Sequence, residues 1–204
     1  MTDMMVMKPW GFEYLFYENE SVAVWCLHIS EGHETSLHCH PNKKTGLVLL
    51  AGEAALSFLN DTVEMKWLDR QVLRPGLFHS TRAVGSDVVM LEVEAPPNKE
   101  DIVRFEDKYG REGAPIEGVS EMRELGEEYP RLGDGRAIGG CKIAVRRMAV
   151  EKNAVIAVLS GGLRAGEDVI VEPGDVGTMR SFTRLAMRFE TIKGTELLSI
   201  CAKG

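Results

Sequence analysis

The sequence predicts an all-β protein built as a barrel or a sandwich. Short runs with strand character recur along the chain and are separated by turns that contain Gly, Pro, Asn or Asp, which is typical of such folds. Residues 47–50 are apolar throughout, as in a strand that is buried on both faces. The pattern of the first half also returns in the second half, as in a duplicated architecture.

The first half contains most of the expected strands. They cover residues 14–17, 22–29, 36–40, 47–50, 54–59, 62–67, 71–73 and 88–93. The segment KPWG, at residues 8–11, reads as an entry turn because Pro9 fixes its own φ and Gly11 permits a turn. These boundaries predict a first lobe over residues 1–111.

A polar stretch rich in Gly and Glu follows the first lobe. We expect residues 112–140 to be a connector, with a short helix from Ser120 to Leu125 that Ser120 would cap. Strand signals return at Cys141, which places a second lobe at 141–204. In this lobe VIAVLSGG echoes LVLLAGE, IVEPGD echoes VLRPGL, and TELLSICA echoes DVVMLEVEA. The second copy has no histidine, since the last one in the chain is His79.

Composition narrows the function classes. The chain has 204 residues and a net charge of −7, with no basic stripe, which argues against a nucleic-acid partner. No apolar segment is long enough to cross a bilayer, and the start lacks the pattern of a signal peptide. The four cysteines are scattered, without a CxxC pair. We therefore expect a cytoplasmic protein with free thiols and no membrane partner.

Three histidines form the candidate metal site. His38 and His40 are two residues apart in a strand-like run, so both imidazoles point to one face and Cys39 points to the other. His79 follows the RPG turn at 74–76. Three nitrogen ligands with open positions suit a catalytic metal ion. The alternative is that these are three unrelated polar side chains on a barrel.

Several charged residues near the histidines are candidates for substrate contact. Lys43 can bind a phosphate or sugar hydroxyl, or it can be a solvated turn residue. Arg104 can bind an anion bidentately, as can Arg111, or it can pair with a nearby carboxylate as a structural tether. Glu34, like His33 beside it, is a candidate general base. Glu92 or Glu94 would supply a metal-ligating oxygen if one of them faces inward.

The motifs around these residues resemble a known superfamily. Gly32-x5-His38-x-His40 followed by Gly52 resembles the first cupin motif, and the segment PGLFH at 75–79 resembles the second. The resemblance implies a cupin (double-stranded β-helix, jelly-roll) barrel, with the second half as a degenerate second lobe of a bicupin. It also implies a divalent metal ion (Zn, Ni, Mn or Fe); imidazole accepts Zn, Fe, Ni or Cu, so ligand type alone does not choose the metal.

The flanking segments narrow the resemblance to one branch. KPWG at 8–11, SLHCHPNKK at 36–44 and EDIVRFEDKYGR at 100–111 resemble the cupin domain of type II mannose-6-phosphate isomerases, which are often fused to mannose-1-phosphate guanylyltransferases. This similarity covers residues 8–111. The second half looks like the degenerate second lobe of other phosphomannose isomerases.

The chain departs from that branch at the pocket. Thr45 stands where the family usually has a glutamate ligand, and His38 stands where the branch usually has glutamine. Glu34 lies where a basic residue is usual, and Ser80 follows His79 where arginine is usual. These departures imply a retained scaffold with altered pocket chemistry.

The resemblance and the histidines together lead to one functional hypothesis and two alternatives. The hypothesis is a metal-dependent, isomerase- or epimerase-like enzyme that acts on a sugar or sugar phosphate in carbohydrate metabolism. The alternatives are a sugar-binding or regulatory cupin without catalysis and a metal-dependent oxygenase. The resemblance also implies a homodimer.

Overall fold

The structure is a computed structural model that describes residues 4–112, 121–147 and 151–203. Its elements in the first half are β1 (Met4–Lys8), β2 (Gly11–Glu18), β3 (Ala23–Ile29), β4 (Leu37–Cys39), β5 (Lys44–Phe58), β6 (Thr62–Met65), β7 (Arg70–Leu73), β8 (His79–Ala95) and β9 (Val103–Glu106). The later elements are β10 (Met122–Glu124), β11 (Cys141–Arg146), β12 (Val155–Ser160), β13 (Leu163–Ala165), β14 (Asp168–Val171), β15 (Val176–Thr178), α1 (Met179–Ala186), β16 (Glu190–Thr191) and β17 (Glu196–Ala202).

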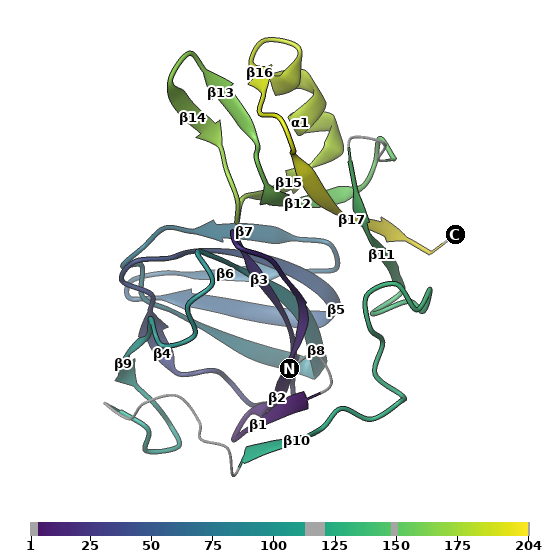
Figure 1. The fold of residues 1–204 in the computed structure, drawn as a ribbon. Helices are drawn as coiled ribbons and strands as arrows, with labels where there is room; N and C mark the ends of the chain where they lie inside the picture. The colour runs from purple at the N-terminus through teal and green to yellow at the C-terminus, as the bar shows by residue number, and fades with distance from the viewer. Residues whose placement is uncertain (1–3, 113–120, 148–150, 204) are drawn as a thin grey trace.

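The first lobe is a curled β-sheet. Strands β1 to β10 belong to one 10-stranded sheet, in which the path β10-β1-β2-β3-β8-β4-β9 is joined by β5, β6 and β7. The long strand β8 pairs with β3, β4 and β5, so it links the two sides of the barrel (Figure 1). The predicted fold class, an all-β barrel, is confirmed.

The central strand β5 is buried on both faces. Its side chains alternate between two apolar clusters because successive residues of a strand point to opposite faces. Leu47 and Leu49 belong to the cluster inside the barrel. Val48 and Leu50 belong to a cluster on the outer face of the sheet. This explains the uninterrupted apolar run and confirms that residues 47–50 are a buried strand.

The second lobe consists of two small sheets and a helix. The sheets have the orders β11-β17-β12-β15 and β14-β13-β16, and α1 lies beside them (Figure 1). The antiparallel pair β12–β17 is formed by the two segments whose sequences echo parts of β5 and β8, which also pair with each other. Whether this lobe is a degenerate cupin stays a prediction, as do the domain boundaries.

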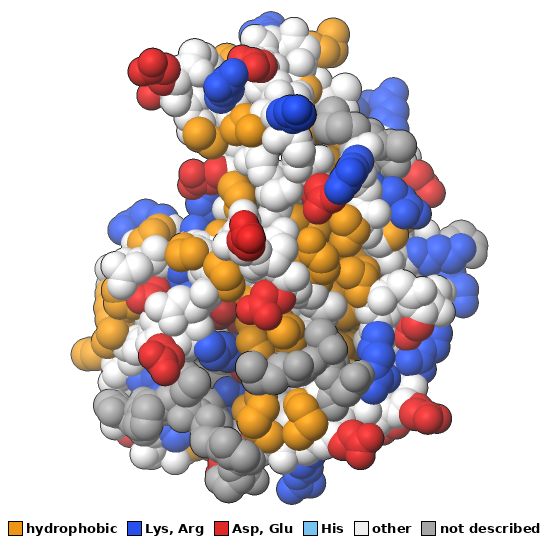
Figure 2. Space-filling view, viewed as in Figure 1, with side chains coloured by type: hydrophobic (Ala, Val, Ile, Leu, Met, Phe, Trp, Pro, Cys, Tyr) orange, Lys and Arg blue, Asp and Glu red, His pale blue; other side chains and the backbone are white. Residues whose placement is uncertain are grey.

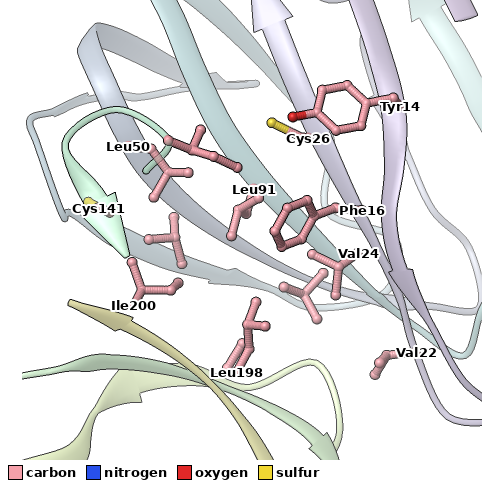
Figure 3. Close-up of a cluster of buried hydrophobic side chains, with 14 of the residues drawn as sticks. Tyr14, Phe16, Val22, Val24, Cys26, Leu50, Leu91, Cys141, Leu198 and Ile200 are labelled. Carbon is pink, nitrogen blue, oxygen red and sulfur yellow. The ribbon is translucent and has the colours of Figure 1, made fainter. Parts of the chain in front are cut away.

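The two lobes share one hydrophobic core. The outer face of the barrel contributes Tyr14, Phe16 and Leu91, and the second lobe contributes Leu198 and Ile200. Figure 3 shows these side chains pointing toward one another across the junction. Hydrophobic side chains are also visible at the junction of the lobes in Figure 2, where acidic and basic side chains are interspersed over the rest of the visible face.

The connector differs from expectation. A helix was expected at 120–125, but Met122–Glu124 is strand β10, which pairs with β1 through the register Met5↔Arg123. An isolated helix of this length is only marginally stable because nucleation is costly, whereas this segment pairs with the edge of β1. Ser120, the expected cap, lies outside the described residues.

Helix α1 was not expected from the sequence. Thr178 caps it by accepting a hydrogen bond from the backbone N–H of Ser181, while Met179 and Phe182 are buried. In the described part of the chain, no helix has the length and apolar character needed to cross a membrane.

Candidate metal centre

Three histidines from separate parts of the first lobe meet inside the barrel. His38 lies in β4, His40 follows that strand, and His79 begins β8. His38 and His79 are cross-strand partners, and the three ring centroids are 4.4–5.5 Å apart. One ligand atom from each ring lies within 4.8 Å of those of the other two. The structure therefore brings together the three residues that the sequence nominated.

Backbone carbonyls fix the orientation of all three imidazoles. The Nδ1 atoms of His38, His40 and His79 lie 2.7, 2.7 and 3.0 Å from the carbonyl oxygens of Ser36, Asp101 and Leu77. A carbonyl only accepts, so we assign the proton of each neutral ring to Nδ1. Each Nε2 then offers a lone pair, which is the arrangement found in metal sites.

Burial favours the neutral, ligand-competent form of these rings. Burial lowers the pKa of His79 to about 4. Burial, reinforced by His79 and His40, also holds the pKa of His38 well below its usual range. The Nε2 atom of His40 is buried and has no hydrogen-bond partner among the described residues. An unpartnered nitrogen in this position is costly unless another group binds it, so the residues present fit a metal ion.

His38 and His40 line a small cavity of about 60 Å³ with strongly charged walls. Its lining includes five cationic side chains and three carboxylates, and so favours an anionic ligand. The cationic residues are Lys8, Lys43, Lys99, Arg104 and Arg111, and the carboxylates are Glu13, Glu92 and Glu94.

Lys43 is a buried member of this wall. Its side chain is only 1% exposed, and its Nζ lies 2.5 Å from Glu94 Oε1 and 3.0 Å from the carbonyl oxygen of Asn98. Its backbone N–H donates to Asp101 Oδ2, as does that of Asn42. The alternative of a solvated turn lysine is therefore wrong, because the loop after His40 folds back into the barrel.

Two glutamates on β8 face the histidines. Glu92 Oε1 lies 3.7 Å from His40 Nε2, and His40, Glu92 and Glu94 each place a ligand atom within 4.8 Å of the others. Glu92 and Glu94 are both buried. Glu92 and Glu94 thus both face the inside of the barrel, as a metal-ligating role for either residue requires.

Thr45 occupies the position at which the family resemblance implies a glutamate. The residue is 1% exposed, and its Oγ1 is buried without a hydrogen-bond partner among the described residues. Its cross-strand partner is Glu94. A carboxylate is therefore present beside position 45, although on the neighbouring strand.

The remaining nominated residues lie in different places. Arg104 lines the cavity from β9 and is the cross-strand partner of His38. Arg111 also lines it, and its guanidinium binds both oxygens of Asp107, at 2.7 and 3.0 Å. Glu34 does not belong to the cavity lining; it pairs with Lys108 at 3.0 Å. Its role as a base stays a prediction.

Sequence reasoning did not nominate Lys8, Glu13 and Lys99. Lys8 and Lys99 lie 3.3 and 2.6 Å from Glu13 Oε1. Burial opposes the charge of Lys99, but the carboxylates of Glu13 and Glu94 raise its pKa. Glu13 is a charged residue inside the otherwise apolar run Phe12–Tyr17, which could have marked it as a candidate site residue. The sequence did not show, however, which face of that strand points into the barrel.

No family model matches this chain. No curated protein matches it either. Solved structures with which it shares part of its fold include a double-stranded β-helix protein from Klebsiella pneumoniae, at 23% identity over 47% of this chain and 84% of that one, with a TM-score of 0.43. An RmlC-like cupin from Desulfovibrio desulfuricans is similar at 24% identity over 42% and 82%, with a TM-score of 0.40.

A third similar structure is the capsular polysaccharide assembling protein CapF from Staphylococcus aureus. The identity is 18%, the TM-score is 0.45, and the match covers 50% of this chain and 34% of CapF. The site residues therefore have to be interpreted from their own geometry.

Proposed function

We propose that this protein is a metal-dependent cupin that acts on a sugar or sugar phosphate with isomerase- or epimerase-like chemistry. The observation that supports this most is the cluster of three buried histidines, each oriented by a carbonyl that holds the proton on Nδ1 and leaves Nε2 as the ligand atom. His38, His40 and His79 would hold a divalent ion (Zn, Ni, Mn or Fe). When bound, such an ion polarises a carbonyl or hydroxyl oxygen of the substrate.

Glu94 is the proposed proton-transfer group. Its Oε1 accepts a hydrogen bond from Lys43, while its Oε2 is buried without a partner among the described residues. Lys43 thus fixes the carboxylate, and the second oxygen remains able to accept a proton from a carbon next to a carbonyl and to return it to the adjacent carbon. Glu94 replaces Glu34 as the first candidate because only Glu94 lines the cavity.

The excess of cationic side chains in the cavity lining supports an anionic substrate. Arg104 lies across the strand pair from His38, so a sugar phosphate bound at the histidines can place its anionic group near this guanidinium. Lys43 is the other nominated contact, but its 2.5 Å contact with Glu94 makes positioning of that carboxylate its first role.

Elemental analysis of the purified protein tests the metal site. Protein prepared without chelators is expected to hold close to one metal ion per chain, and His38→Ala combined with His79→Ala is expected to remove it. His28→Phe is the matched control, since His28 stacks on Phe12 outside the cavity and should not change metal content. A metal-free wild type would contradict the proposal.

Solvent exchange tests the chemistry. Aldose and ketose phosphates are incubated with the protein in D2O, and deuterium incorporation next to the carbonyl is followed by NMR. Wild type is expected to catalyse exchange and Glu94→Gln to lose it while still binding metal. Sugar binding without exchange would support the non-catalytic alternative, and stoichiometric iron with oxygen consumption would support the oxygenase.

The sequence-based expectation of a homodimer remains part of the proposal. Light scattering at several protein concentrations tests it, with a mass close to twice that of one chain as the expected result.

A further inference from the structure

Position 45 leaves the candidate metal centre without the carboxylate that the motif resemblance implies there. Thr45 is buried, and its hydroxyl oxygen has no hydrogen-bond partner among the described residues. A hydroxyl is a much poorer ligand than a carboxylate for a divalent ion. Another residue must supply a carboxylate if the centre is to have one.

The neighbouring strand places two carboxylates on the same side of the sheet. In the antiparallel pair β5–β8, Glu94 is opposite Thr45 and Glu92 is opposite Leu47. Leu47 belongs to the cluster inside the barrel, and directly opposed residues share one face. Both glutamates therefore point into the barrel, toward the space that a side chain at position 45 would enter.

Their partners distinguish the two glutamates. Glu94 is bound by Lys43 at 2.5 Å. Glu92 instead lies beside the imidazole of His40, whose Nε2 is 3.7 Å from Glu92 Oε1. This distance exceeds that of a hydrogen bond. The proton of His40 is assigned to Nδ1, which lies 2.7 Å from the carbonyl oxygen of Asp101, so two lone pairs face each other in a buried site.

A metal ion shared by His40 and Glu92 explains this separation. His40 belongs to both candidate ligand groups, whereas Glu92 is grouped with His40 and Glu94 and not with His38 and His79. Two ligand atoms at about 2.0–2.1 Å from one tetrahedral ion lie about 3.3 Å apart, which is a few tenths of an ångström less than the 3.7 Å between His40 Nε2 and Glu92 Oε1. An ion between the two atoms would turn their repulsion into attraction. We propose that Glu92, from the closing strand β8, is the carboxylate ligand of the centre and replaces the one that position 45 lacks.

This inference rests on the proposed three-histidine metal site, so its test measures metal affinity rather than turnover. Zn²⁺ affinity is measured by competition with a chromophoric chelator, and the Co²⁺-substituted protein is examined by visible absorption. Glu92→Gln is expected to weaken Zn²⁺ binding about 100-fold or more, at or above the upper end of the loss seen when a group that only supports a ligand is removed. It should also change the Co²⁺ bands.

Glu13→Gln is the matched control. Glu13 lines the same cavity and its substitution removes the same charge, but it belongs to neither candidate ligand group. We expect it to weaken Zn²⁺ binding by less than 10-fold and to leave the Co²⁺ bands unchanged. Equal losses in the two variants would show that Glu92 acts only through its charge and would overturn the proposal.

Two further variants keep the test decisive if Glu92→Gln folds poorly. Glu92→Asp keeps the charge but shortens the reach, so affinity should fall and the Co²⁺ bands should shift. Thr45→Glu in the Glu92→Gln background should recover at least 10-fold in affinity by restoring a carboxylate from β5. Wild-type affinity in Glu92→Gln would refute the inference and leave the three-histidine site intact, whereas a wild type that binds no Zn²⁺ or Co²⁺ would refute both.

Discussion

Lys44 in the barrel and Asp175 in the second lobe form an ion pair, with Nζ and Oδ1 2.7 Å apart. Lys44 Nζ also lies 2.7 Å from Glu172 Oε1. Lys44 is the first residue of β5 and directly follows the buried Lys43. The turn between β14 and β15 is thus attached to the strand end that borders the candidate site.

Removal of this ion pair should have a modest effect. We expect Lys44→Met to lower the free energy of unfolding by about 1 kcal/mol, because the pair is partly exposed and screened by solvent, and by less in 1 M salt. Urea unfolding at two salt concentrations measures this. Arg164→Gln, which breaks the surface pair with Glu190, should cause no measurable change. Equal effects of the two variants would argue against a special role for Lys44.

Gly46 allows the second lobe to approach β5 closely. A Cβ at this position would lie 2.5 Å from the carbonyl oxygen of Gly174 and 2.6 Å from Val176 Cγ1. Gly46→Ala should therefore destabilise the protein by about 1–3 kcal/mol through overpacking. Gly177→Ala is the control, since nothing lies within 4 Å of a Cβ there. Thermal unfolding of both variants checks this, and equal midpoints would show that the lobes separate readily.

The shared hydrophobic core should make the two lobes unfold together. All three tryptophans, Trp10, Trp25 and Trp67, are in the first lobe, so their fluorescence reports on the barrel. Leu198→Ala in β17 truncates a fully buried side chain of the shared cluster. It should lower the free energy of unfolding, followed by tryptophan fluorescence in urea, by about 2–5 kcal/mol. Leu185→Ala, at an exposed position, should not. An unchanged tryptophan midpoint in Leu198→Ala would indicate independent lobes.

His28 should make stability depend on pH. It stacks on Phe12 at 4.4 Å between ring centroids, and burial lowers its pKa to about 4, partly offset by Asp87. The unfolded chain, with a histidine pKa near 6.5, binds the proton more readily. The contribution of neutral His28 to the free energy of unfolding is thus complete above pH 6.5 and is lost as the pH falls toward 4. It amounts to at most about 3 kcal/mol.

The variant His28→Phe isolates this contribution. The difference in unfolding free energy between wild type and variant should change in favour of the variant between pH 7.5 and pH 4.5. Other buried histidines are present in both proteins and cancel in this difference. Parallel pH curves would show that His28 is not the titrating group.

Metal should stabilise the folded protein. A ligand that binds the native state more strongly than the unfolded state raises stability by about 2.7 kcal/mol at 100 times its Kd. We expect added Zn²⁺ to raise the Tm of the metal-free wild type, and EDTA to reverse the rise. The variant with both His38→Ala and His79→Ala should show neither response. A Tm that does not move with Zn²⁺ in wild type would count against the metal site.

Local sequence patterns determined the all-β fold class and the shared face of His38 and His40. Strand alternation placed His38 and His40 on one face because that relation depends only on backbone geometry. The same rule directed Cys39 away, and Cys39 is in neither candidate ligand group. The apolar run at 47–50 similarly indicated a strand buried on both faces.

Only the tertiary structure decided which distant residues share the cavity. His79 meets His38 because β8 pairs with β4, and Lys43 is buried because its loop closes over Glu94. Glu13, Glu92 and Glu94 face the cavity as a result of strand phase and register, which many long-range hydrogen bonds fix together. The sequence by itself thus determined the residues that alternate along one strand, whereas the folded barrel selected their partners, since contacts between strands depend on register rather than on local spacing.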